Sequence, residues 1–215
     1  MTGSRMVAWT GPDPERIDVA HLRLDADRLS AHGSSTTAAY ALTFDLRTDP
    51  QWITRRLDVR VDGDGWWRAL TLHRDERGWT SRRLDASGGD DPRVTDRRHP
   101  ELAGALDCDL ALCPVTNTMP VLREGMLDTS RVGEHRWAEL TMAWVTVPDL
   151  DVQQSVQRYE SGVPVAGGGA QIRFQSGGFV EHIEFDADGV VVSYPSIAHL
   201  ALHPPSSIAA SVNAG

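Results

Sequence analysis

Two aspartates, two residues apart, are the side chains of this sequence best placed for chemistry. Asp107 and Asp109 alternate with apolar residues, which predicts that both carboxylates project from one face of a strand. That strand runs into a polar turn at residues 116–118, flanked by prolines that cannot donate to a sheet ladder. Arg123 follows closely. Acceptors and a guanidinium near a strand end form either a structural corner or a place to hold a ligand.

The aspartate pair also raises the possibility of a metal or a nucleotide sugar. Two carboxylates on one face can hold a divalent cation, as they do in glycosyltransferases. Those enzymes need an α/β nucleotide-binding domain, and the sequence shows no alternation of strands and helices. Its eight histidines have no H-x-H or H-E-x-x-H spacing, and it contains no G-x-S-x-G motif. We therefore expect no metal, no cofactor and no catalytic residue, with the two carboxylates facing water or an arginine.

Another carboxylate stands out because of its apolar neighbours. Glu181 shares its strand face with Phe179, Ile183 and Phe185 by the two-residue period. If that face is interior, burial raises the pKa of Glu181 unless an arginine pairs with it. Two interpretations stay open. Glu181 is either half of a buried ion pair or a polar anchor for a ligand headgroup, and its candidate partners are Arg123, Arg158 and Arg173.

Seven tryptophans are the most informative apolar feature of the sequence. Most are expected in the core, because each ring buries on the order of 200 Å². Trp66 and Trp67 are adjacent, so they point to opposite faces of a strand, and one of them faces solvent or a groove unless both faces are covered. A groove lined by tryptophan suits a stacked sugar ring or an acyl chain.

The elements that must position these residues are predicted to be short strands separated by turns. The clearest strand covers residues 56–62, where charged residues alternate with leucine and valine, and an Asp-Gly turn then leads into residues 66–73. A change of phase within residues 17–24 predicts a bulge near Ala20 and His21. Residues 85–100 are polar and rich in glycine and aspartate, which predicts an exposed loop.

This pattern predicts an all-β chain with minor helix. We expect one strongly curved antiparallel sheet of about ten strands, a half-open barrel or spiral β-roll, because a flat sheet of that size curls or splits. Residues 1–202 are predicted to be a single β-roll domain. Residues 203–215 contain little to bury, which predicts a disordered C-terminal tail.

Composition excludes several classes of partner. The chain has 30 acidic and 21 basic residues, which gives a formal net charge of −9, and every basic residue is an arginine. Nucleic acids and anionic membrane surfaces both need a positive field, so neither is an expected partner. Cys108 and Cys113 fall on opposite strand faces, which predicts buried free thiols. No stretch is apolar enough for a signal peptide or a membrane span, so we expect a cytoplasmic location without stable membrane insertion.

The central stretch resembles a family signature. Asp107-x-Asp109-Leu110, followed by Pro114-x-Thr116-Asn117-Thr118-x-Pro120 and Arg123, is similar to the motif of a bacterial glycolipid-binding family that was formerly a domain of unknown function. Other matching points are Trp144 with Pro148, Gln157-x-Tyr159, Phe179, Asp186-x-x-Gly189 and Tyr194-Pro195, so the resemblance runs from Met6 to Leu202. Val115 and Met119 depart from the motif, and one arginine rather than two follows Pro120.

The resemblance implies a half-open curved sheet like that of bacterial lipoprotein carriers. With the tryptophans, it predicts a non-catalytic protein that holds a lipid or glycolipid in the concave face, with the polar turn and Arg123 near the mouth. Two alternatives stay open: a carboxylate-dependent enzyme acting on a sugar or lipid ester, and a protein-interaction module presenting Trp67. The residues expected to contact the ligand are Trp66, Trp79, Trp144, Asp109, Asn117, Arg123, Tyr159, Glu181 and Tyr194.

Overall fold

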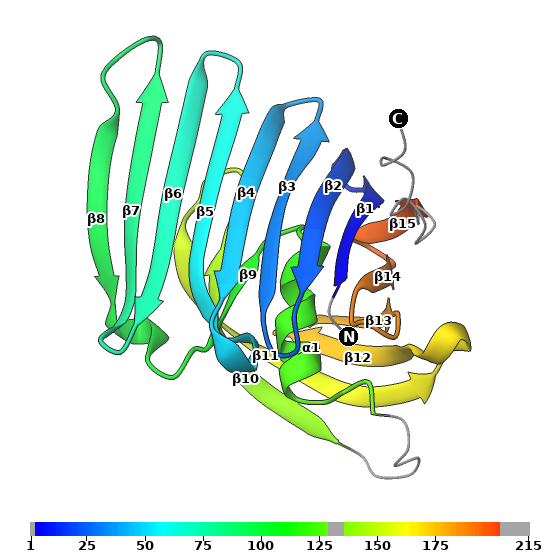
Figure 1. Ribbon diagram of the computed structural model, residues 1–215. Helices are drawn as coiled ribbons and strands as arrows, with labels where there is room; N and C mark the ends of the chain where they lie inside the picture. The colour runs from blue at the N-terminus through cyan, green and yellow to red at the C-terminus, as the bar shows by residue number, and fades with distance from the viewer. Residues whose placement is uncertain (1–2, 129–135, 203–215) are drawn as a thin grey trace, which may run out of the picture.

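The computed structural model describes residues 3–128 and 136–202, and these form one sheet of 15 strands (Figure 1). The order across the sheet is β8-β7-β6-β5-β4-β3-β2-β1-β15-β14-β13-β12-β11-β10-β9, antiparallel except for the parallel pair β9–β10. The elements are β1 (Gly3–Pro12), β2 (Glu15–Leu24), β3 (Leu29–Thr37), β4 (Tyr40–Thr48), η1 (Pro50–Trp52), β5 (Thr54–Gly63), β6 (Trp66–Asp75), β7 (Gly78–Ser87), β8 (Arg93–His99), η2 (Pro100–Leu102), β9 (Asp107–Leu110), η3 (Pro114–Asn117), α1 (Thr118–Arg123), β10 (Trp137–Val145), β11 (Val152–Pro164), η5 (Ala166–Gly168), β12 (Ala170–Ser176), β13 (Phe179–Phe185), β14 (Val191–Tyr194) and β15 (Ala198–Leu202).

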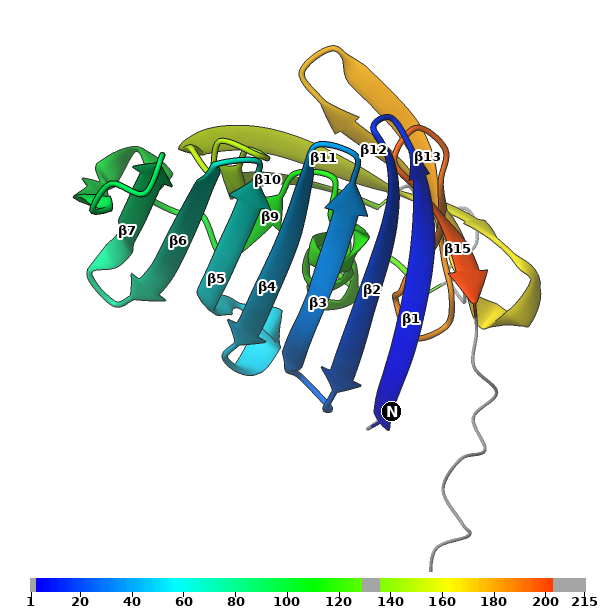
Figure 2. The same cartoon turned by 90° about the horizontal axis from the view of Figure 1, so that it is seen from above.

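The sheet is open, and it curves back over its own concave side. Its edges are β8 and β9, which do not pair with each other. Figure 2 shows β10 and β11 passing behind β3–β6, with β9 and α1 between these two parts of the sheet. Hydrogen bonds join the parts, from the Thr54 amide to the Leu106 carbonyl at 3.0 Å and from the Trp9 indole to the Val191 carbonyl at 2.7 Å. The predicted all-β, half-open curved sheet with minor helix is confirmed, with 15 strands rather than about ten.

The first eight strands owe their order to short turns and strict alternation. In β5, Leu57, Val59 and Val61 are buried, while Arg56 and Arg60 lie on the outer face. Leu57 and Val59 lie opposite Leu46 and Phe44 of β4 and opposite Leu72 and Leu70 of β6, so an apolar layer lines the concave face. This layer is the part of the core against which η3 and α1 pack.

The predicted bulge in the second strand is wrong. β2 keeps one register with β1 and β3 from end to end, and its even-numbered residues face inward throughout. Ile17 is 61% exposed, whereas Arg16 is 2% exposed. The buried arginine is tolerated because its Nε donates to Asp18 at 3.0 Å. It also needs the space left by Gly11, the residue opposite it on β1, since a Cβ at Gly11 would lie 2.3 Å from Arg16 Nη1.

Two further expectations are corrected by the structure. Residues 85–100 are not a single loop, because β7 continues to Ser87 and β8 begins at Arg93. The polar turn at 116–118 is helical and buried, since η3 leads directly into α1. Pro120 fits there because the first turn of a helix leaves its backbone N–H groups without partners anyway. The tail predicted for residues 203–215 lies outside the described residues.

Candidate functional site

A cavity of about 300 Å³ lies on the concave side of the second half of the sheet. Inward-facing side chains of β9–β14 line one side, and the segment that follows β9 lines the other. We call it the aromatic cavity. Its polar lining residues are Asp109, Asn117, Ser155, Gln157 and Ser176, its aromatic ones are Trp144, Phe174, Phe179 and Tyr194, and Leu110–Cys113 and Ile197 complete it.

The polar end of the aromatic cavity is built around Asp109. Its Oδ1 accepts a hydrogen bond from the Thr116 hydroxyl at 2.9 Å, and its Oδ2 accepts one from Gln157 Nε2 at 2.6 Å. The Tyr159 hydroxyl lies 3.1 Å from the side-chain carbonyl oxygens of both Asn117 and Gln157, and it donates to one of them at a time. The network thus fixes the orientation of the Asp109 carboxylate with neutral donors only.

Electrostatically this end of the cavity is negative. Burial raises the pKa of Asp109, and the hydrogen bonds from Gln157 and Thr116 oppose that rise. Burial also raises the pKa of Tyr159 and Tyr194, and the charge of Asp109 adds to both increases. Because none of the described lining residues is Arg or His and the sequence has no Lys, the part of the chain that the structure describes gives the cavity no positive group.

The aromatic end is a cluster of rings in mutual contact. Phe174 lies edge-on to Tyr159, Tyr194 and Phe179, with centroid distances of 5.2, 5.9 and 6.1 Å. Phe179 and Tyr194 are 6.3 Å apart. Phe179 is also 39% exposed, so it stands where the cavity opens to solvent. A ligand entering here would pass aromatic surface before it reached Asp109.

Asp107, the other half of the aspartate pair, has a different role. Arg123 donates from Nη1 and Nη2 to its two carboxylate oxygens at 2.6 Å each, and Asp107 is 1% exposed. Burial raises the pKa of Asp107, and the arginine opposes that rise. The pKa of Arg123 is itself raised, because hydrogen bonds to Asp107 and Glu124 outweigh burial. Arg123 therefore serves this ion pair and does not line the aromatic cavity.

Of the nine residues predicted to contact a ligand, the structure places four at the aromatic cavity. They are Asp109, Asn117, Trp144 and Tyr194, and Tyr159 supports them through Asn117. Trp66 lies far along the sheet in β6, beneath the guanidinium of Arg68 at 4.6 Å. Glu181 is half-buried in the predicted apolar row. Among the described residues it has no ion-pair partner, because Arg158 and Arg173 both pair with Glu160.

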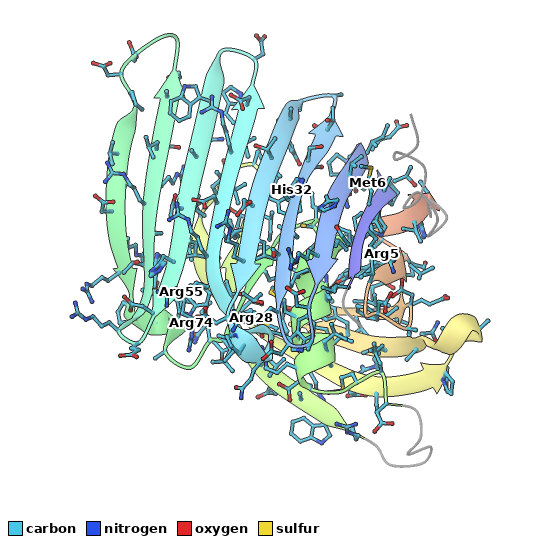
Figure 3. All side chains as sticks on the ribbon, in the orientation of Figure 1. Arg5, Met6, Arg28, His32, Arg55 and Arg74 are labelled. Atoms are coloured by element: carbon cyan, nitrogen blue, oxygen red, sulfur yellow. The ribbon has the colours of Figure 1, made fainter. Side chains whose placement is uncertain are left out.

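Trp79 lies at a separate hollow of about 430 Å³. Its indole donates to the Ala105 carbonyl at 2.9 Å, as does Nε of Arg74 at 3.1 Å. Arg55 and Arg74 lie near each other there (Figure 3), together with Asp49, Asp75 and Glu76. Charges of both signs surround this hollow, and Trp79 is its one aromatic lining residue among those described.

Several cavity residues could not be singled out from the sequence. Gln157 and Phe179 belong to the motif of the resemblance, but neither was selected as a ligand contact. Phe174, Ser155 and Ser176 carry no local signal, since an inward phenylalanine or serine in a strand is ordinary. Their role follows only from the neighbouring strands that bring them to Asp109.

Comparison with known proteins agrees with this fold and with the family resemblance. The family model described as "Putative glycolipid-binding" matches residues 6–199. The chain belongs to this family. A crystal structure of a DUF1089 family protein from Pseudomonas aeruginosa shares the fold with a TM-score of 0.58 at 23% identity, covering 85% of this chain and 91% of that one. A search of curated proteins finds no match.

The described residues contain neither a membrane-spanning helix nor a metal cluster. None of the helices in residues 3–128 and 136–202 is long and apolar enough to cross a membrane. Within the same ranges, no group of three or more His, Cys, Asp or Glu side chains could hold a metal ion. Cys108 and Cys113 are free, the first buried and the second half-buried.

Proposed function

We propose that this protein binds the polar headgroup of a glycolipid in the aromatic cavity and does not alter it chemically. The observation that carries the proposal is the composition of the cavity: four aromatic side chains line it together with a fixed hydrogen-bonding network around Asp109. Aromatic faces suit the apolar faces of a sugar ring, and carboxylate and amide groups suit its hydroxyls. The family to which the chain belongs supports the same class of ligand.

The size of the cavity limits which part of a glycolipid it can hold. Its volume of about 300 Å³ is at the lower end of the ~300–1,000 Å³ found for small-molecule sites. One ring with its first substituents fits, but a whole lipid does not. The concave face of β3–β5 is not open for an acyl chain, because η3 and α1 are packed against it. The acyl chain would therefore leave the cavity beside Phe179.

The enzymatic alternative has less support. A glycosidase of the usual kind needs two carboxyl groups about 5–10 Å apart facing one cleft. Among the described residues, Asp109 is the single carboxylate that lines the aromatic cavity, and Asp107 is held by Arg123. The interaction-module alternative rested on Trp67, which is half-buried beneath Arg60 at 4.4 Å.

The test is native mass spectrometry of protein purified without detergent, followed by organic extraction of whatever is bound. Two variants of β11 locate the site. Ser155→Phe places a ring inside the aromatic cavity, and Val156→Phe places the same ring on the opposite, exposed face of the strand.

We expect a glycolipid mass on the unaltered protein and on the Val156→Phe variant, and its loss from Ser155→Phe. Retention by both variants would put the ligand elsewhere on the molecule. An unaltered protein that carries no ligand and takes up no added glycolipid would refute the proposal.

A further inference from the structure

Three aspartates, of which Asp18 and Asp107 are buried and Asp109 is half-buried, differ in how their charge is balanced. Asp18 has Arg16 at 3.0 Å, and Asp107 has Arg123 at 2.6 Å. Asp109 has neither an arginine nor a histidine within ion-pair distance among the described residues, and its two hydrogen bonds come from uncharged groups. A carboxylate largely withdrawn from water without a partner of opposite charge is costly, so such groups are normally paired. Asp109 is the one of the three that lines a cavity large enough for a ligand.

The surroundings of Asp109 reinforce this imbalance. Among residues 3–128 and 136–202, the lining of the aromatic cavity contains one acidic and no basic side chain, and the charge of nearby Glu181 also acts on Tyr194. An anionic headgroup, such as a phosphate, a sulfate or a free carboxylate, would meet only repulsion here. A neutral sugar would leave the charge of Asp109 unbalanced.

We infer that the aromatic cavity selects a headgroup that carries an ammonium group, such as an amino sugar, and that Asp109 is its counter-charge. This inference rests on the proposed function and narrows its ligand class. The carboxylate keeps acceptor capacity beyond the bonds from Thr116 and Gln157, because an ionised carboxylate has about four lone-pair sites. A charge-assisted hydrogen bond from an ammonium group is stronger than one from a hydroxyl.

The aromatic residues that line the cavity also favour an ammonium group. Trp144, Phe174, Phe179 and Tyr194 all line the cavity with Asp109. Cations are attracted to the faces of aromatic rings within about 6 Å of the centroid, and aromatic enclosures are a recurring way to bind ammonium ligands. A carboxylate and several aromatic rings around one small volume therefore favour binding of an ammonium group over a hydroxyl group of similar size.

A pair of amphiphiles that differ in one group tests this directly. Octyl glucoside and octyl 2-amino-2-deoxyglucoside are titrated calorimetrically into the full chain, below the concentrations at which they form micelles and at a pH where the amine is charged. We expect the amine to bind about tenfold more tightly or better, since hydrogen bonds between charged partners exceed neutral ones by that order. Asp109→Asn should remove the preference, so that the two amphiphiles bind the variant with similar affinities.

The control is Glu139→Gln, which changes the net charge equally at an exposed position of β10 and should keep the preference. Equal binding of the two amphiphiles, or a preference that survives Asp109→Asn, would overturn the inference and leave glycolipid binding standing. Failure of both amphiphiles to bind would count against the proposed function and the inference together. The comparison on the unaltered protein needs no variant, so it stands even if Asp109→Asn folds poorly.

Discussion

At the scale of single residues, the aspartate pair separates into two roles that sequence spacing cannot tell apart. Asp107 and Asp109 both project from the same face of β9, yet one meets Arg123 and the other meets Gln157 and Thr116. The difference arises from which element lies opposite each carboxylate. Asp107 thus belongs to a structural ion pair, whereas Asp109 lines the aromatic cavity without an oppositely charged partner among the described residues.

The unbalanced charge of Asp109 predicts a dependence of stability on pH. Its pKa in the folded protein is raised above the ordinary 3.8, so between these two values the folded protein binds more protons than the unfolded chain. The contribution of Asp109 to stability is therefore fully present below pH 3.8 and is lost as pH rises through its folded pKa. For each pH unit by which a carboxyl pKa in the folded protein exceeds its value in the unfolded chain, ionisation of that group lowers the free energy of unfolding by about 1.4 kcal/mol.

Asp109→Asn cannot ionise, so we expect its free energy of unfolding, relative to the unaltered protein, to rise with pH from 3.8 toward neutrality. Urea denaturation of both proteins without ligand, across that range, measures the difference. The comparison cancels the other groups with raised pKa, Asp18 and Asp107, which both proteins share. Parallel curves would mean that Asp109 has no raised pKa in the folded protein.

At the scale of elements, α1 and η3 occupy the concave face that would otherwise be open. They carry a run of buried residues from Pro114 to Val121, including Val115 and Met119. Arg123, in the last turn of α1, links this helical segment to β9 through its ion pair with Asp107. The aromatic cavity lies beside the helix, between the segment after β9 and strands β10–β14.

Replacing Arg123 tests how much the ion pair with Asp107 stabilises the fold. Arg123→Met leaves the Asp107 carboxylate buried without its partner, which typically costs about 3–5 kcal/mol of stability. Denaturant unfolding measures the loss. Arg47→Met is the control, because its ion pair with Asp45 is mostly exposed and such pairs contribute about 0–1 kcal/mol.

The double variant Asp107→Leu with Arg123→Met should be more stable than Arg123→Met alone, since it removes the unpaired charge. A single variant as stable as Arg47→Met would show that the ion pair does not hold the helix in place. An unrescued double variant would instead indicate that the shape of the Arg123 side chain, not its charge, is what the site needs.

At the scale of the whole molecule, the sheet leaves two edges of different character. β9 is short and enclosed between β10 and the rest of the fold, whereas β8 lies at the outer edge and is exposed at every residue from 93 to 98 (Figure 1). Three arginines on this strand, Arg93, Arg97 and Arg98, oppose pairing with a second copy, because charged edge strands resist edge-to-edge association.

Hydrogen exchange should distinguish the outer edge from the centre of the sheet. We expect the amides of β8 to exchange on the order of 100-fold faster than those of β5, because local opening is easiest where few apolar contacts are lost. Exchange of the whole protein, read by mass spectrometry of peptides, measures the ratio. Equal protection of the two strands would mean that β8 is covered in solution, and a concentration dependence would then identify self-association.

Much of this protein was determined by the sequence alone. The period of two and the Asp-Gly turns predicted a curved, all-β fold, because alternation and turn chemistry act over a few residues. The motif around Asp107 and Asp109 pointed to the correct family, and Asp109, Asn117, Trp144 and Tyr194 were selected before their neighbours were known. What failed locally was the phase of β2, because Arg16 and Asp18 resemble surface residues although they neutralise each other inside.

The tertiary structure alone decided which of these residues share a cavity. Trp66 and Trp79 are as aromatic as Trp144, but the curvature of the sheet leaves them far from it or beside another hollow. Arg123 could have faced a ligand, yet the turn of α1 directs it to Asp107. Charge balance depends on residues far apart in the chain that folding brings within a few ångströms. That is why the sequence could show two aspartates, and only the fold could show that one of them has no oppositely charged partner among the described residues.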